Sequence, residues 1–116
     1  MENTIAERSF DFAVRIVNLY KYLTTEYKEY TLSRQHLRCG TSIGANVAEA
    51  QRGQSRADFA AKMNIALKEA NEADYWLKLL YKTEYLDSVQ YESMNRDIQN
   101  LLRILVAICK KAQMPK

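Results

Sequence analysis

The stretch Ser-Ile-Gly-Ala-Asn-Val-Ala-Glu-Ala-Gln-Arg, at positions 42–52, decides how this chain folds. It has the composition of a helix, but it combines small residues with a hydroxyl, an amide and a carboxylate. Gly40, Gly44 and Ala48 are spaced by four, so they share one helix face and predict a small-residue groove for a neighbouring helix. Each glycine inside a helix costs about 1 kcal/mol relative to Ala. Close approach of another helix is the usual reason to retain it.

A polar face follows the same predicted helix. Ser42, Asn46 and Glu49 fall close to one side, in line with Arg38. This face is either solvated, or a ligand or nucleic-acid surface, or a partly buried network that sets the register of the helices. A buried lone carboxylate is costly, so Glu49 needs a donor in the last case. We favour the structural polar network and place Ser42, Asn46, Glu49 and Glu72 in it.

Length and composition describe one globular domain, residues 1–116. Hydrophobic residues make up 47% of the chain and charged residues 27%, which is ordinary for a globular protein. Three glycines and one proline are too few for the turns of an all-β chain. No apolar run suits a signal peptide or approaches the roughly 18 residues of a membrane-spanning helix. We therefore expect a cytoplasmic protein that does not enter a membrane.

Helical periodicity extends over most of the chain and predicts four helices. The first covers about 3–27 and the second about 33–52. Short connections between four helices favour an antiparallel up-down-up-down four-helix bundle, an all-α fold. Gly53 is expected to end the second helix in the left-handed conformation. The expected N-caps, in chain order, are Asn3, Ser33, Ser55 and Asp87 or Ser88.

Apolar residues at alternating spacings of four and three predict the core faces of the last two helices. Alanines at the centre of the third helix allow a close approach of its neighbour. On the third helix this face comprises Phe59, Met63, Ala66, Ala70, Ala73, Leu77 and Leu80. On the fourth it comprises Tyr91, Met94, Ile98, Leu101, Leu105 and Ile108.

The first helix carries two apolar stripes, which is more than one core contact requires. One stripe contains Phe10, Val14 and Val17, and the other contains Phe12, Ile16, Leu19 and Leu23. Two interpretations remain open. Either the helix is wedged deeply into the bundle, or one stripe meets another subunit.

Cys39 and Cys109 are far apart in sequence, and the chain has a single histidine, His36. No CxxC motif or metal-ligand spacing is present, so we expect neither a metal site nor a cofactor. The cysteines are expected to be buried thiols that pack as small hydrophobic residues in a reducing compartment.

A family resemblance rests on the same central stretch. The pattern is Gln35-x-x-Arg38, then residues 42–49, then Phe59, Ile65-Ala66 and Glu72, with the run 62–77. It resembles the proteins encoded in intervening sequences of bacterial 23S ribosomal RNA genes, which also carry a ribosomal-protein-like label. The resemblance implies an antiparallel four-helix bundle that assembles into a ring, a homopentamer. It also implies kinship with the accessory variability determinant of diversity-generating retroelements, a basic barrel that works with a reverse transcriptase and nucleic acid.

Positive charge is concentrated in residues 33–56 and 93–116, although the net charge is only +3. The leading functional prediction is therefore a non-enzymatic oligomer that binds RNA or DNA phosphates. The same cations could instead be solvated side chains next to acidic neighbours, and Arg38 could pair with Glu49 or Glu72. The candidate nucleic-acid-binding residues are Arg34, Arg38, Arg52, Arg56, Arg103, Lys110 and Lys111.

The alternative prediction is a structural or adaptor ring that binds another protein and no nucleic acid. Its recognition face would be the acidic segment 58–92 with the aromatic residues of the third helix. An enzyme is not expected, because the sequence has no Gly-rich phosphate loop and no nucleophile–base pairing.

Overall fold

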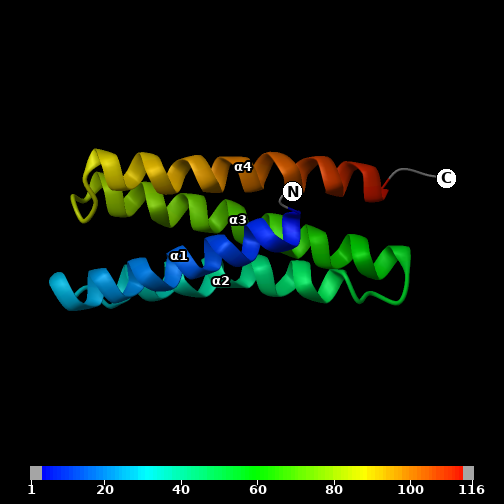
Figure 1. The fold of residues 1–116 in the computed structure, drawn as a ribbon, viewed down its shortest axis with the longest axis horizontal. Coiled ribbons are helices and arrows are strands. Elements are labelled where there is room, and N and C mark those ends of the chain that lie inside the picture. The colour runs from blue at the N-terminus through cyan, green and yellow to red at the C-terminus, as the bar shows by residue number, and fades with distance from the viewer. Residues whose placement is uncertain (1–3, 114–116) are drawn as a thin grey trace.

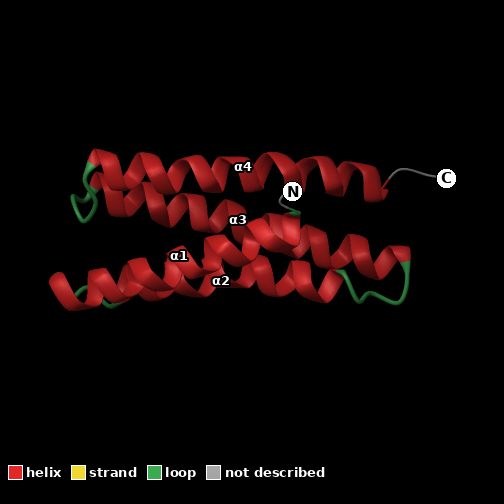
Figure 2. Ribbon diagram, in the orientation of Figure 1, coloured by secondary structure: helices red, strands yellow, loops and turns green. Residues whose placement is uncertain are grey.

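The computed structural model describes residues 4–113, and these residues form four α-helices without strands. The helices are α1 (Ile5–Glu26), α2 (Thr31–Ala50), α3 (Arg56–Lys82) and α4 (Ser88–Gln113). Figure 1 shows them side by side along one long axis, and Figure 2 shows that only short loops join them. The all-α four-helix prediction is confirmed. Across the described residues, no helix is long and apolar enough to cross a membrane.

The first two helices begin differently from the prediction. Asn3 lies outside the described residues, and Thr4 caps α1 instead, in a reciprocal capping box with Glu7. Ser33 is not an N-cap, because α2 already begins at Thr31. The buried Glu29 carboxylate performs this role by accepting the amides of Leu32 and, at 3.0 Å, Ser33. The sequence pattern missed this cap because Glu is not among the preferred capping residues.

The last two helices begin as predicted. Ser55 accepts the amide of Asp58 at 3.0 Å, and Asp87 accepts the amide of Gln90 at 2.7 Å. The prediction for Gly53 is wrong, because no glycine among the described residues has a positive φ. A side chain at position 53 would lie 3.2 Å from the Ala50 carbonyl and the Asp58 carboxylate. Close packing, and not a left-handed turn, favours glycine here.

The core follows the predicted faces of α3 and α4. All the predicted core residues of α3 from Met63 to Leu80 are buried, and Phe59 is half-buried. On α4 the central residues Met94 to Leu105 of the predicted face are buried, while Tyr91 and Ile108 at its ends are half-buried. Cys39 and Cys109 are buried free thiols, as predicted.

The two apolar stripes of α1 differ in burial. Phe12, Ile16 and Leu23 are buried in the core, whereas Phe10 is 66% exposed and Val14 is 46% exposed. The deeply wedged interpretation of α1 is therefore wrong for a single chain. One apolar stripe faces outward.

The small residues of α2 let α1 approach its backbone. A side chain at Gly40 would come within 2.7–2.9 Å of the Ile16 side chain, and one at Gly44 would lie 3.1 Å from the Ser9 carbonyl oxygen. Ala48 does not belong to this groove, because it is exposed. The glycines of the central stretch thus place α1 on α2.

Consecutive helices pack against each other along three seams, and the fourth seam, between α1 and α4, is the smallest. The α1–α2 and α3–α4 connections lie at one end of the bundle (Figure 1). The α2–α3 connection and the end of α4 lie at the other end, and α1 starts short of that end. The particle is elongated, with extents of 50 × 26 × 21 Å.

Candidate functional site

Four of the seven predicted nucleic-acid-binding residues lie at one end of the bundle, and a fifth, Arg103, lies farther along α4. Arg52 lies in the α2–α3 connection, Arg56 is the first residue of α3, and Lys110 and Lys111 occupy the last turn of α4. The Arg56 guanidinium donates to the backbone carbonyl of Lys111 at 3.4 Å, which joins the two helix ends directly. Arg103 lies two turns before Lys110 on α4, and its guanidinium donates to the Asn100 side-chain oxygen at 2.6 Å. All five side chains are exposed.

This region carries little compensating negative charge. We call residues 49–62 and 103–113 the basic end; they contain six Lys or Arg and two carboxylates. Both carboxylates are engaged, since Glu49 pairs with Lys62 at 3.0 Å and Asp58 accepts the amide of Gln54 at 3.3 Å. The side chains of Arg52, Lys110 and Lys111 have no hydrogen-bond or ion-pair partner within residues 4–113. The basic end therefore presents positive charge to solvent.

Arg34 and Arg38 lie apart from the basic end. Arg34 is exposed in the first turn of α2, at the opposite end of the molecule. Arg38 reaches from α2 to α3 and donates to Glu72 at 2.6 Å and Glu69 at 3.0 Å. These bonds, that to Glu72 above all, raise the pKa of Arg38. Two carboxylates neutralise Arg38, so it does not add to a phosphate-binding surface.

Glu72 is the centre of this small cluster. Its Oε2 also accepts the indole N–H of Trp76 at 3.0 Å. The bonds from Trp76 and then Arg38 lower the pKa of Glu72, because both favour the charged carboxylate. The cluster joins α2 to α3 and fixes their relative register.

The four residues of the predicted polar network form three separate groups within the described residues. Asn46 donates to the carbonyl and hydroxyl oxygens of Ser42, at 2.9 and 3.1 Å. Glu49 is 59% exposed and pairs with Lys62 on α3, whereas Glu72 belongs to the Arg38 cluster. The Ser42–Asn46 group lies within α2, whereas the two groups that contain a glutamate connect α2 with α3.

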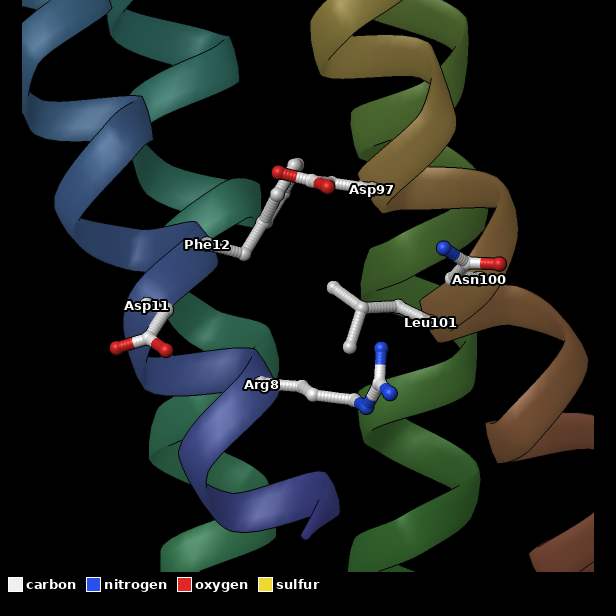
Figure 3. A pocket seen from close by; sticks show the side chains of 6 residues that line it. All are labelled: Arg8, Asp11, Phe12, Asp97, Asn100 and Leu101. Carbon is white, nitrogen blue, oxygen red and sulfur yellow. The ribbon is translucent and has the colours of Figure 1, made fainter. Parts of the chain in front are cut away.

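A small pocket of about 190 Å³ lies in the α1–α4 seam (Figure 3). Arg8 of α1 and Leu101 of α4 point toward each other across the gap, with Asn100 beside them. Asp11 and Asp97 complete the polar lining. One guanidinium and two carboxylates give this pocket mixed charge, so it does not extend the basic end.

Two comparisons with known proteins agree with this architecture. The family model described as 23S rRNA-intervening sequence protein matches residues 1–107. The chain belongs to this family. The structure is also similar to the crystal structure of a protein of unknown function from the S23 ribosomal protein family of Bacteroides thetaiotaomicron VPI-5482, with a TM-score of 0.90. The two sequences are 57% identical, and the match covers 92% of this chain and 99% of the other. No curated protein matches.

Burial favours the neutral forms of the histidine and of the two cysteines in this structure. Burial lowers the pKa of His36 to about 4 and raises the pKa of the Cys39 thiol to about 12. Burial also raises the pKa of Cys109. A neutral thiol is a weak nucleophile. In the part of the chain that the structure describes, no group of three His, Cys, Asp or Glu side chains can hold a metal ion.

Sequence reasoning missed how the tyrosines gather in this family member. Tyr22, Tyr27, Tyr81 and Tyr85 come from both sides of two connections and meet at the end opposite the basic end. The signal was the recurrence of tyrosine near predicted helix ends. It did not show that the four segments meet. Tyr75 and Trp76, by contrast, lie in the last third of α3 and pack edge-to-face, with ring centroids 5.1 Å apart.

Proposed function

We propose that this protein is a non-enzymatic oligomer that binds RNA or DNA through phosphate groups at its basic end. The observation that carries the proposal is that Arg52, Arg56, Lys110 and Lys111 lie exposed at one end of the bundle, with the exposed Arg103 two turns away on α4. Contacts of this kind fix a nucleic acid by its backbone and carry little sequence information. We therefore expect weak sequence preference and steep salt dependence.

Oligomerisation is part of the proposal. Phe10, Ala13, Val14 and Val17 line a hollow of about 390 Å³ on the outer face of α1. Exposed apolar stripes of this kind typically mark interaction surfaces. A second copy of the chain would cover it, and the family resemblance suggests a ring, a homopentamer. Each copy in a ring repeats the basic end, so a modest charge per chain becomes a strong field.

Three further parts of the proposal rest on the sequence. They are a location in the cytoplasm, the lack of catalytic activity, and kinship with the accessory variability determinant of diversity-generating retroelements. That kinship agrees with nucleic-acid binding by a basic helical barrel.

The test is fluorescence anisotropy with a labelled single-stranded RNA and a labelled DNA duplex over a salt series. If the five candidate cations of one basic end, all but Lys62, contact phosphates, log K falls with log salt at a slope of about −3.5 for the single strand and −4.5 for the duplex. Light scattering on the same sample gives the mass. Absence of binding to both probes at low salt contradicts nucleic-acid binding, and a stable monomer contradicts the ring.

The second candidate function is an adaptor that binds a protein and no nucleic acid. The exposed aromatic surface favours it, because Tyr75 is 59% exposed beside Trp76 on the acidic segment. The salt series separates the two functions, since an adaptor binds neither probe.

A further inference from the structure

A pocket of about 530 Å³ opens at the end of the bundle opposite the basic end. It lies between the last turns of α1 and α3 and the first turn of α4. We call it the tyrosine pocket, and its main lining residues are Tyr22, Tyr27, Tyr81, Glu84 and Asp87. Its lining combines aromatic rings with carboxylates, unlike the mixed pocket of the α1–α4 seam.

The rings of this pocket hold one another in place. Tyr27 packs edge-to-face on Tyr22 and on Tyr85, with ring-centroid distances of 5.9 and 5.4 Å. Tyr81 stacks on Tyr91 at 4.3 Å with nearly parallel planes. Tyr27 nevertheless remains 46% exposed, so aromatic surface is open to a ligand.

The two connections beside the pocket have defined backbone conformations. Lys28 and Glu84 adopt left-handed φ angles of 53° and 71°, which are unusual for residues other than glycine. The amides of Glu84 and Tyr85 donate back to the end of α3, at 3.1 and 2.9 Å. Leu86 is buried beneath the connection. These bonds preform the pocket, which lowers the entropy lost when a ligand binds.

The potential in the pocket is negative on balance. Glu84 and Asp87 line it, against one cation, Lys82. The hydrogen bond that the Tyr27 hydroxyl donates to Tyr22 is the main reason that the pKa of Tyr27 is raised, and the charges of Asp87 and Glu26 raise it further. Within residues 4–113, the Glu84 carboxylate has no hydrogen-bond or ion-pair partner. Negative charge beside open aromatic faces favours an organic cation.

We propose that the tyrosine pocket binds an arginine side chain from an exposed segment of a partner protein. A guanidinium stacks on aromatic faces and also pairs with carboxylates, so it uses both features of the lining. A nucleic-acid phosphate would be repelled by Glu84 and Asp87, and a neutral apolar ligand would leave both carboxylates unused. The proposal does not depend on nucleic-acid binding, which concerns the opposite end of the molecule.

The test is an NMR titration of the full-length protein with a short glycine-flanked arginine peptide whose ends are blocked. A peptide with citrulline in place of arginine keeps the planar shape, replaces one NH2 donor by a carbonyl oxygen and removes the charge. We expect saturable shifts at Tyr22, Tyr27, Tyr81 and Glu84 with the arginine peptide, and binding weaker by about fivefold with citrulline. Equal affinity for both peptides, or shifts confined to other regions, overturns the proposal.

Variants at the two ends of the bundle provide matched controls. Glu84→Gln combined with Asp87→Asn removes both charges but keeps an N-cap residue on α4. We expect this double variant to lower the affinity for the arginine peptide by about fivefold or more. Glu49→Gln at the basic end should leave that affinity unchanged. Unchanged affinity in the double variant overturns the proposal. So does tighter binding of tetramethylammonium than of the peptide, since the ligand would then be a free quaternary ammonium ion.

Discussion

The two ends of this bundle are built from the same kind of helix but carry different surfaces. The basic end has six cations, two carboxylates and no tyrosine. The other end, residues 22–34 and 78–92, is the tyrosine end; it has six of the eight tyrosines, five carboxylates and four cations. The buried faces of the helices run through both ends without a break. The surface at each end can therefore change without altering the core, and binding at the two ends can be tested separately.

The largest expected effect concerns stability in acid and comes from His36, in the second turn of α2 and nearer the tyrosine end. Burial lowers its pKa to about 4, below the unfolded value of 6.5, so the unfolded chain binds more protons in acid. The stability contribution is complete above pH 6.5 and declines as the pH falls toward 4, by about 3 kcal/mol in total. Urea unfolding at several pH values measures it.

His36→Leu is the control, since leucine does not titrate and leaves no buried nitrogen without a partner. Its unfolding free energy should change less between pH 6.5 and 4 than that of the wild type. If both proteins lose the same stability in acid, His36 is not the sensitive group.

The next largest effect separates the two ends by charge. Replacing Arg103, Lys110 and Lys111 by Gln should weaken nucleic-acid binding on the order of 30-fold and make the salt slope shallower by about 2 to 3. The control replaces Lys28, Arg34 and Lys82 at the tyrosine end, which changes the net charge equally. Equal losses in the two triple variants would mean that only net charge matters.

A smaller effect compares the helix caps of the two ends. Glu29→Ala leaves two amides of α2 without their buried acceptor and should cost about 2 kcal/mol. Ser55→Ala at the basic end removes one exposed bond and should cost about 1 kcal/mol. Urea unfolding measures both. A larger loss for Ser55→Ala would mean that the Glu29 bonds contribute little.

The smallest effect concerns the α1–α4 seam between the ends. Arg15 crosses it to the Ser93 hydroxyl at 2.7 Å and to the Asp97 carboxylate, and both ionic side chains are about 40% exposed. Arg15→Gln should therefore cost less than about 1 kcal/mol. Nucleic-acid and arginine-peptide affinities should stay at wild-type values. A change in either affinity would show that the ends are coupled through this seam.

Sequence reasoning predicted the features that depend on local periodicity. The spacing of Met63 through Leu80 located the core face of α3. Gly40 and Gly44 indicated a close contact with another helix, without showing which helix it is. It could not identify Ile16 as the residue that fills the groove at Gly40. That contact depends on how far α1 slides along α2.

Sequence reasoning named the cations of the candidate site but could not predict which of them lie together. Arg52 and Arg56 are close in sequence, yet the contact of Arg56 with Lys111 depends on the antiparallel pairing of α3 and α4. Arg38 has the same residue type, but the register of α2 against α3 places it between two carboxylates. Residue type alone could not separate these arginines, because their neighbours come from other helices.

The small α1–α4 seam also has a consequence for how quickly the chain folds. Every other seam joins helices that are consecutive in sequence, so most native contacts need only short loops to close. Chains with such local contacts fold in microseconds to milliseconds. The seam that Arg15 crosses brings together the most distant segments, and we expect it to form after the rate-limiting step. Weakening it should then speed unfolding and leave the folding rate nearly unchanged.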